Sequence, residues 1–130
     1  MLLKEHYYFA PMFSPKQKHK TYKDNLTFFK IKSIKENNDL GIIRFSDMIP
    51  VPQNSVELLD MEDKSYAYKR LLSKQYNYIN IPKNRHKIMD KAEKLYNIVT
   101  GEGKGKTVKF YKNLSCNFKL LEAQSLKYNI

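Results

Sequence analysis

The sequence predicts an α+β domain in which strands come first and helices follow. In the first half of the chain, apolar residues alternate with polar ones, whereas in the second half they recur every three or four residues. A length of 130 residues, of which 42% are hydrophobic, suffices for one core of moderate size. We therefore expect a single domain over residues 1–130, built as one small, strongly curved antiparallel sheet that carries one layer of helices.

The expected strands are short and are separated by turn residues. In the segment 26–34, for example, Thr27, Phe29 and Ile31 alternate with the residues between them. The turn signal at 37–39 is followed by a compact apolar run. On these grounds strands are expected at residues 7–10, 26–34, 40–45, 48–51 and 56–59.

Helical periodicity begins near residue 66. Between 66 and 80, apolar residues fall on one side of a helix and basic or polar residues on the other, and Pro82 is expected to end this helix. A second amphipathic helix should contain Ile88 to Val99 and stop at Gly101, and a short helix should follow Ser115. The segment between them, 101–106, predicts a mobile basic loop, because it contains three of the four glycines and two lysines. Its glycine spacing is not that of a nucleotide-binding loop.

The charge narrows the classes of partner. The chain has 24 Lys plus Arg against 13 Asp plus Glu, a net charge of +11, which favours nucleic acid or another anionic partner. The alternative is a solvated Lys-rich surface that reflects an AT-rich genome. No long apolar run predicts a membrane span, and the first residues do not resemble a signal peptide. These two observations lead us to expect a cytoplasmic protein. The lone Cys116 predicts neither a disulfide nor a metal site, so we expect no cofactor.

One segment carries the strongest chemical signal. Residues 8–16 read Tyr-Phe-Ala-Pro-Met-Phe-Ser-Pro-Lys, and the two prolines favour extended backbone around the serine. Ser14 and Lys16 are therefore expected at a strand-to-loop junction, where both can reach one oxyanion. In a chain this basic, that oxyanion is a phosphate. His19 follows as a candidate acid or base near neutral pH, although a histidine that is exposed or binds phosphate as a cation is the alternative.

These residues favour cleavage of RNA without a metal ion. Carboxylate pairs typical of glycosidases or two-metal nucleases do not stand out, and Ser14 is not in a G-x-S-x-G motif. RNA carries its own nucleophile, the 2′-hydroxyl, so a protein need only orient it, stabilise charge at phosphorus and move protons. Lys16 suits the charge stabilisation, and Ser14 could bond the phosphate or the leaving 5′-oxygen. The alternatives are a solvated lysine and a serine that caps a turn.

Basic and aromatic residues are the candidates for RNA binding. Lys69, Arg70 and Lys74 form the basic side of the helix at 66–80 and would contact phosphates, although a merely solvated face is the alternative. Lys18 adds a cation beside the Ser14 segment. Several aromatic residues could stack on unpaired bases, although most are expected in the core: they are Phe13, Tyr66, Tyr76, Tyr78 and Tyr111. A DNA-binding regulator is disfavoured, because the same helix offers only Gln75 and Asn77 to read bases.

Four blocks in one order resemble the toxins of type III toxin–antitoxin systems, the ToxN/AbiQ/CptN family. The blocks are Phe-Ala-Pro-Met-Phe-Ser-Pro-Lys (9–16) with His19 after it, Leu-Gly-Ile-Ile-Arg-Phe-Ser-Asp-Met-Ile-Pro-Val (40–51), Tyr-Lys-Arg-Leu-Leu-Ser-Lys-Gln (68–75) and Ser-Cys-Asn-Phe-Lys-Leu-Leu-Glu (115–122). The resemblance implies a compact curved sheet similar to that of MazF/Kid toxins, with flanking helices. It also implies a metal-independent endoribonuclease that leaves a 2′,3′-cyclic phosphate.

The resemblance implies roles and partners as well. Ser14, Lys16 and His19 match the catalytic block, whereas Phe13 stands where members often carry a Thr that helps hold the phosphate. The implied antitoxin is RNA, cut by the toxin into short pseudoknot repeats that form a closed toxin–RNA assembly. The implied targets are cellular or phage mRNA, in abortive infection. The alternative is a catalytically degenerate RNA-binding remnant.

The family usually carries a further segment before the residues that match Met1, including an opening strand. The resemblance therefore predicts a domain that is incomplete at its N-terminus. Either the start is misassigned, or the chain is a truncated form in which one strand edge is unpaired.

Overall fold

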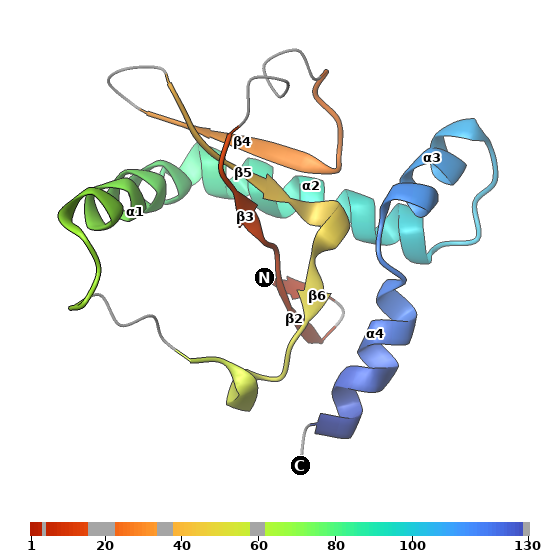
Figure 1. Cartoon of the computed structure of the whole chain (residues 1–130). Helices are drawn as coiled ribbons and strands as arrows, with labels where there is room; N and C mark the ends of the chain where they lie inside the picture. The colour runs from red at the N-terminus through yellow and green to blue at the C-terminus, as the bar shows by residue number, and fades with distance from the viewer. Residues whose placement is uncertain (4, 16–22, 34–37, 58–61, 129–130) are drawn as a thin grey trace.

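The structure, a computed structural model, describes residues 1–3, 5–15, 23–33, 38–57 and 62–128 (Figure 1). Strands precede helices along the chain, as expected for an α+β fold. The strands are β1 (Leu2–Leu3), β2 (His6–Phe9), β3 (Met12–Phe13), β4 (Phe28–Lys32), β5 (Asp39–Arg44) and β6 (Ile49–Pro50). The helices are α1 (Tyr66–Ile79), α2 (Pro82–Thr100), α3 (Lys106–Leu114) and α4 (Phe118–Ser125), with short 3₁₀ helices at Phe45–Asp47, Gln53–Ser55 and Leu126–Tyr128.

The described strands form two small antiparallel sheets, so the expectation of a single sheet is wrong. Their strand orders are β1-β2-β6 and β3-β5-β4. The break lies within one long strand pairing: two residues separate Phe9 from Met12, but five separate their partners Ile49 and Ile43. The extra residues form the 3₁₀ turn Phe45–Asp47, which bends the pairing and divides it.

Four expected strands are confirmed: β2 and β5 begin and end one residue earlier than expected, and β4 and β6 are shorter than expected. The expected strand at 56–59 is wrong for Val56 and Glu57, which belong to no strand, and residues 58–59 lie outside the described residues. Strands β1 and β3 lie in the segment that precedes and includes the Ser14 motif. Each is only two residues long, because only two of its residues align with a partner strand.

The helices differ from expectation in two ways: Pro82 has another role than expected, and the structure contains one additional helix, α3. Helix α1 is capped by Ser65, whose hydroxyl accepts from the Tyr68 N–H at 3.2 Å, and it ends before Pro82. Pro82 is the first residue of α2, where a missing N–H costs nothing, so this proline begins one helix rather than ending another. Helix α3 is not among the expected elements. It follows Gly105, whose φ of 124° favours glycine, and α4 agrees with expectation.

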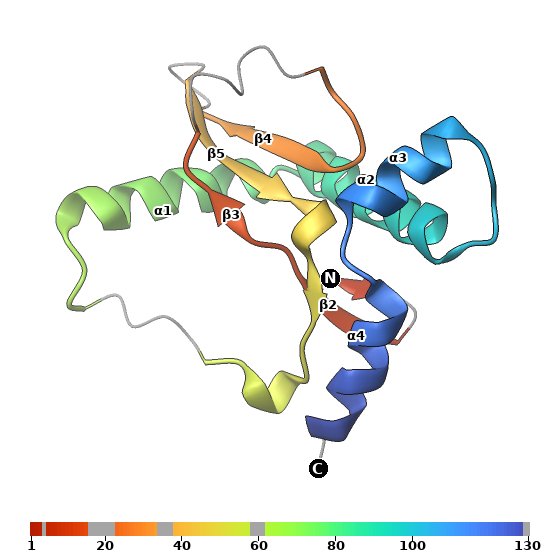
Figure 2. The ribbon, with the colours of Figure 1, turned by 45° about the vertical axis from the view of Figure 1, so that its right-hand side comes forward.

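The core lies between the sheets and the helices. Helices α1 and α2 lie behind the β3-β5-β4 sheet, whereas α4 runs alongside β2 and β6 (Figure 2). The fully buried side chains come from both halves of the chain: they include Tyr8, Ile31, Phe45, Met48, Leu95, Tyr96 and Phe118. The Tyr96 ring stacks on that of Phe118, with centroids 5.9 Å apart. The first and last elements are therefore packed into one core.

Candidate functional site

Ser14 follows β3 directly and lines a cavity of about 420 Å³ between the β3–β5 edge and α1. Met12 and Leu40 line its strand side, and Tyr68, Leu71 and Gln75 line its helix side. A larger cavity, of about 550 Å³, lies beside β2 and α4 and contains none of the predicted site residues. The cavity beside Ser14 is therefore the candidate site.

A bulge in β5 shapes the floor of this cavity. Ile31 of β4 faces Gly41 and Lys32 faces Asp39, so Leu40 has no partner in β4. Its carbonyl oxygen instead accepts a hydrogen bond from Gln75 Nε2 of α1, at 2.9 Å. A Cβ at Gly41 would stand 3.0 Å from the same nitrogen, so glycine allows the helix this close. The bulge thus fixes α1 against the strand that ends at the site.

The apolar side of α1 is only partly in the core, which corrects the expectation for this helix. Gln75 is its buried residue, whereas Tyr68, Leu71 and Tyr76 are 40%, 36% and 68% exposed. Tyr68 and Leu71 line the cavity instead of packing against a further layer. The helical periodicity is confirmed, but part of the apolar face borders an open site.

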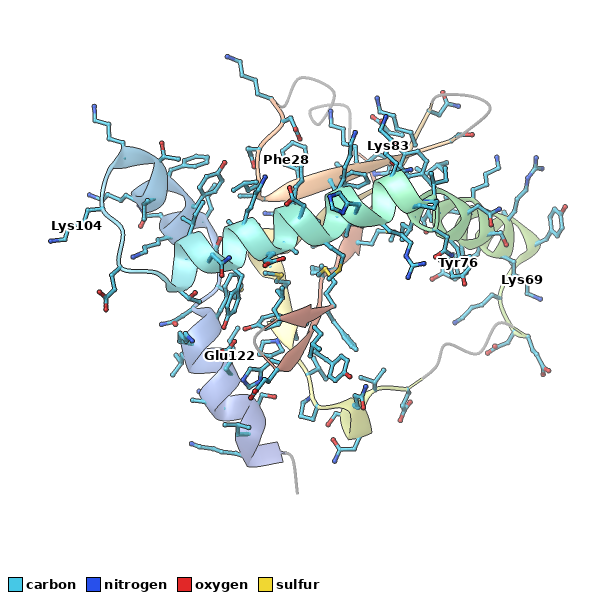
Figure 3. All side chains as sticks on the ribbon, turned by 180° about the vertical axis from the view of Figure 1, so that it is seen from behind. Phe28, Lys69, Tyr76, Lys83, Lys104 and Glu122 are labelled. Carbon is cyan, nitrogen blue, oxygen red and sulfur yellow. The ribbon has the colours of Figure 1, made fainter. Side chains whose placement is uncertain are left out.

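The three predicted phosphate-binding residues of α1 do not all face the cavity. At about 100° per residue, Lys69 and Lys74 lie about 120° and 100° to either side of Gln75, and Arg70 about 140° away. Lys69 is at the outer end of α1 in Figure 3. None of the three lines the cavity beside Ser14. By helix geometry, Lys69 and Lys74 lie on the flanks of α1 and Arg70 lies farthest from Gln75.

Phe13 has a basic neighbour that the sequence pattern alone does not reveal. The Arg44 guanidinium lies 5.3 Å from the centroid of the Phe13 ring and forms an ion pair with Asp47 at 3.4 Å. Phe13 faces Ile42 across the β3–β5 pair, and Arg44, two residues on, shares the face of Ile42. Strand alternation could have revealed this neighbour, but only once the register was known.

The aromatic residues divide into two groups. Tyr78 packs against Phe29 with centroids 6.3 Å apart, and the buried Tyr111 hydroxyl accepts from the Leu26 N–H at 3.3 Å, so both serve the core. By contrast, Phe13 is 42% exposed, and Tyr66 and Tyr76 are more exposed still. Three of the five candidate aromatic residues are therefore exposed, so the expectation that most of them are buried is wrong.

Lys16, Lys18 and His19 lie outside the described residues, so their positions relative to Ser14 stay predictions. Within the described ranges, no three His, Cys, Asp or Glu side chains gather in a way that could hold a metal ion. In the same ranges, none of the helices combines the length and apolar character needed to span a membrane.

Comparison with known proteins supports the family resemblance that the four sequence blocks indicate. Residues 1–126 match the family model for toxin ToxN of type III toxin–antitoxin systems. The chain is 37% identical to the endoribonuclease ToxN of Pectobacterium atrosepticum over 121 residues, and 30% identical to that of Bacillus thuringiensis subsp. kurstaki over 127 residues. These matches cover 90% and 95% of this chain but 64% and 62% of the relatives, so the chain spans somewhat less than two thirds of their length.

The fold is shared with solved structures. One, from a study of selective toxin inhibition by a non-coding RNA pseudoknot in type III systems, superposes with a TM-score of 0.82 at 27% identity, covering 98% of this chain and 75% of its own. Another is the lactococcal anti-phage endoribonuclease AbiQ, with a TM-score of 0.80 at 29% identity, covering 96% of this chain and 73% of its own. With the family match over nearly the whole sequence, this chain belongs to the ToxN toxin family of type III toxin–antitoxin systems.

Proposed function

We propose that this chain is an endoribonuclease toxin of a type III toxin–antitoxin system. The observation that carries the proposal is the family match over residues 1–126, within which Ser14 borders an open cavity. The curated relatives are named endoribonucleases. The alternative of a degenerate RNA-binding remnant is not favoured, because Ser14, Lys16 and His19 are all present.

In the proposed reaction the 2′-oxygen of a ribose attacks the adjacent phosphorus, and the bond from phosphorus to the 5′-oxygen breaks. The products are a 2′,3′-cyclic phosphate and a 5′-hydroxyl, and no metal ion takes part. Lys16 stabilises the charge that builds on the non-bridging oxygens, and Ser14 donates a hydrogen bond to the phosphate or the leaving oxygen. His19 moves a proton near neutral pH.

Phe13 removes one donor from this segment relative to the family pattern. Its neighbour Arg44 carries several N–H donors and an ion pair that is exposed to solvent. We propose Arg44 as the substitute contact for a phosphate beside the Phe13 ring, which itself can stack on a base. Lys18 and the flanking Lys69 and Lys74 would contact further phosphates, and Arg70 would do so from the outer side of α1.

The proposed partners are RNA molecules: cellular or phage mRNA as targets and a short pseudoknot RNA as antitoxin. A net charge of +11 favours such partners, and one structural relative comes from a system in which an RNA pseudoknot inhibits the toxin. We further propose a closed assembly of toxin and antitoxin, action in the cytoplasm, and a sheet curvature similar to that of MazF/Kid toxins.

The test is cleavage of an end-labelled single-stranded RNA in EDTA by the native chain and by Lys16→Ala. We expect the native chain to cut and Lys16→Ala to be slower by about 100-fold or more, because the variant lacks the charge aimed at the transition state. Lys23→Ala, an exposed lysine after the Ser14 segment, is the control and should keep its rate. Full activity of Lys16→Ala, with circular dichroism unchanged in both variants, would defeat the assignment.

A further inference from the structure

The cavity beside Ser14 has the size and walls of a site for one flat ring. Its volume of about 420 Å³ is within the range of small-ligand sites. Apolar side chains of Met12, Leu71 and Leu72 line it, together with the Tyr68 ring. Unpaired RNA bases are bound by such surfaces, which cover their faces and leave their edges to polar groups.

The polar side chains that line the cavity are Gln75 and Asp39, together with the hydroxyls of Ser14 and Tyr68, which can donate or accept. Gln75 has a fixed orientation, because the Leu40 carbonyl can only accept and therefore requires the amide nitrogen. The other amide atom, Oε1, therefore remains as an acceptor. Asp39, at the start of β5, adds a carboxylate to the same cavity. An ionised carboxylate accepts hydrogen bonds and donates none.

A carboxylate here is unsuited to a phosphate, because like charges repel. It suits the edge of a base that donates hydrogen bonds. Adenine, cytosine and guanine each carry an exocyclic amino group, whereas uracil presents carbonyl oxygens on either side of one N–H. Those oxygens would face the acceptor oxygens of Asp39 and Gln75. The repulsion would disfavour uracil as effectively as an added hydrogen bond favours another base.

We propose that this cavity binds one unpaired base next to the scissile phosphate, and that Asp39 and Gln75 select a base with an exocyclic amino group over uracil. The inference rests on the proposed function for the nature of the ligand. The β5 bulge supports it structurally, since it sets Asp39 on the strand while Gln75 holds the helix to Leu40. Both selecting groups are therefore placed by rigid elements rather than by loops.

The test measures binding rather than cleavage, with the unaltered chain and short oligouridines whose 2′-oxygens are methylated to prevent reaction. One RNA is all uridine, and three others carry a single central adenosine, guanosine or cytidine. We expect at least one of the three to bind about tenfold more tightly than all-uridine, from the hydrogen bonds gained. A central purine ribonucleoside without the amino group should bind like uridine.

Two variants assign the effect to the cavity. Asp39→Asn adds a donor, so it should accept uracil and reduce the preference to within about threefold. Asp63→Asn removes the same charge from an exposed position before α1 and should keep the preference. Equal affinity for all four RNAs, failure to bind any of them, or an unchanged preference in Asp39→Asn would overturn the inference.

The two proposals fail separately. Base preference that depends on Asp39, without any cleavage of unmethylated RNA, would retain the base site and reject the endoribonuclease. Cleavage in EDTA without base preference would do the reverse.

Discussion

One carboxylate joins three elements that are distant in the sequence. Glu122 of α4 accepts hydrogen bonds from the Tyr8 hydroxyl of β2 at 2.7 Å and from the Tyr96 hydroxyl of α2 at 2.6 Å. It is 6% exposed, and Figure 3 shows it where α4 passes the first strands. Because β2 leads through Pro11 to β3 and Ser14, this carboxylate positions the strand that carries the candidate site.

We expect Glu122→Gln to lower the free energy of unfolding by about 1.5–3 kcal/mol, since bonds to a charged group are replaced by weaker ones. Urea unfolding followed by circular dichroism measures the change. Glu93→Gln, at an exposed position of α2, is the matched control and should alter the free energy by about 0.5 kcal/mol or less. Equal midpoints for the two variants would show that the buried carboxylate contributes no net stability.

The same hydrogen bonds predict how stability changes at alkaline pH. Burial, with the Glu122 carboxylate alongside, raises the pKa of Tyr8 and of Tyr96 well above the ordinary value of 10. The unfolded chain then releases protons that the folded chain keeps. Stability is therefore intact below pH 10 and falls above it, by about 1.4 kcal/mol per pH unit for each tyrosine.

Tyr8→Phe should remove one of these contributions, so its stability falls less steeply above pH 10 even though it starts lower at neutral pH. Tyr66→Phe, at a position that is 79% exposed, should keep the native slope. Urea midpoints between pH 8 and 11 test this, and parallel curves for Tyr8→Phe and the native chain would contradict it.

The elements were predictable where their signals were local. Alternation and period indicate β2, β4, β5, β6, α1, α2 and α4. A proline before a helix looks the same as a proline after one, so the prediction for Pro82 is wrong. The division into two sheets depends on the turn at 45–47, which belongs to no repeated pattern. Helix α3 has only nine residues and begins at the last residue of the glycine-rich segment 101–106, whose composition indicates a loop and hides the start of the helix.

Helix α1 allows a test of phosphate binding. Replacing Lys69, Arg70 and Lys74 by alanine should flatten the salt dependence of RNA binding, lowering the slope of log K against log salt by about 0.7 for each phosphate of a single strand that the helix no longer neutralises. Fluorescence anisotropy between 50 and 300 mM salt gives the slope. We expect a decrease that corresponds to about one to three phosphates, because Lys69 and Lys74 flank the cavity and Arg70 lies beyond it.

The control is the triple variant Lys104→Ala, Lys106→Ala, Lys109→Ala, which removes the same charge around the start of α3. Lys104 and Lys69 lie at opposite ends of the molecule (Figure 3). An equal decrease in slope for both variants would mean that α1 contributes only through net charge, and that RNA does not bind along this helix.

Across the whole molecule, the site combines a local motif with contacts that no local pattern encodes. Ser14 is recognisable because a hydroxyl, two prolines and a lysine stand together in the sequence. Gln75 and Asp39 are not recognisable as site residues in this way, since their roles follow from a bulge that places residue 40 against residue 75. Arg44 escapes notice as well, because its neighbour across the β3–β5 pair depends on register.

The net charge of +11 favours an RNA partner but does not identify the reaction. The proposed mechanism requires that the RNA supply its own nucleophile, and a single 2′-deoxy substitution at the cleaved bond is the sharpest test of that requirement. In EDTA, we expect the ribose substrate to be cut to a 2′,3′-cyclic phosphate and a 5′-hydroxyl, while the substituted bond stays intact. Cleavage of the substituted bond, or products that end in a 5′-phosphate, would show that water is the nucleophile and contradict the mechanism.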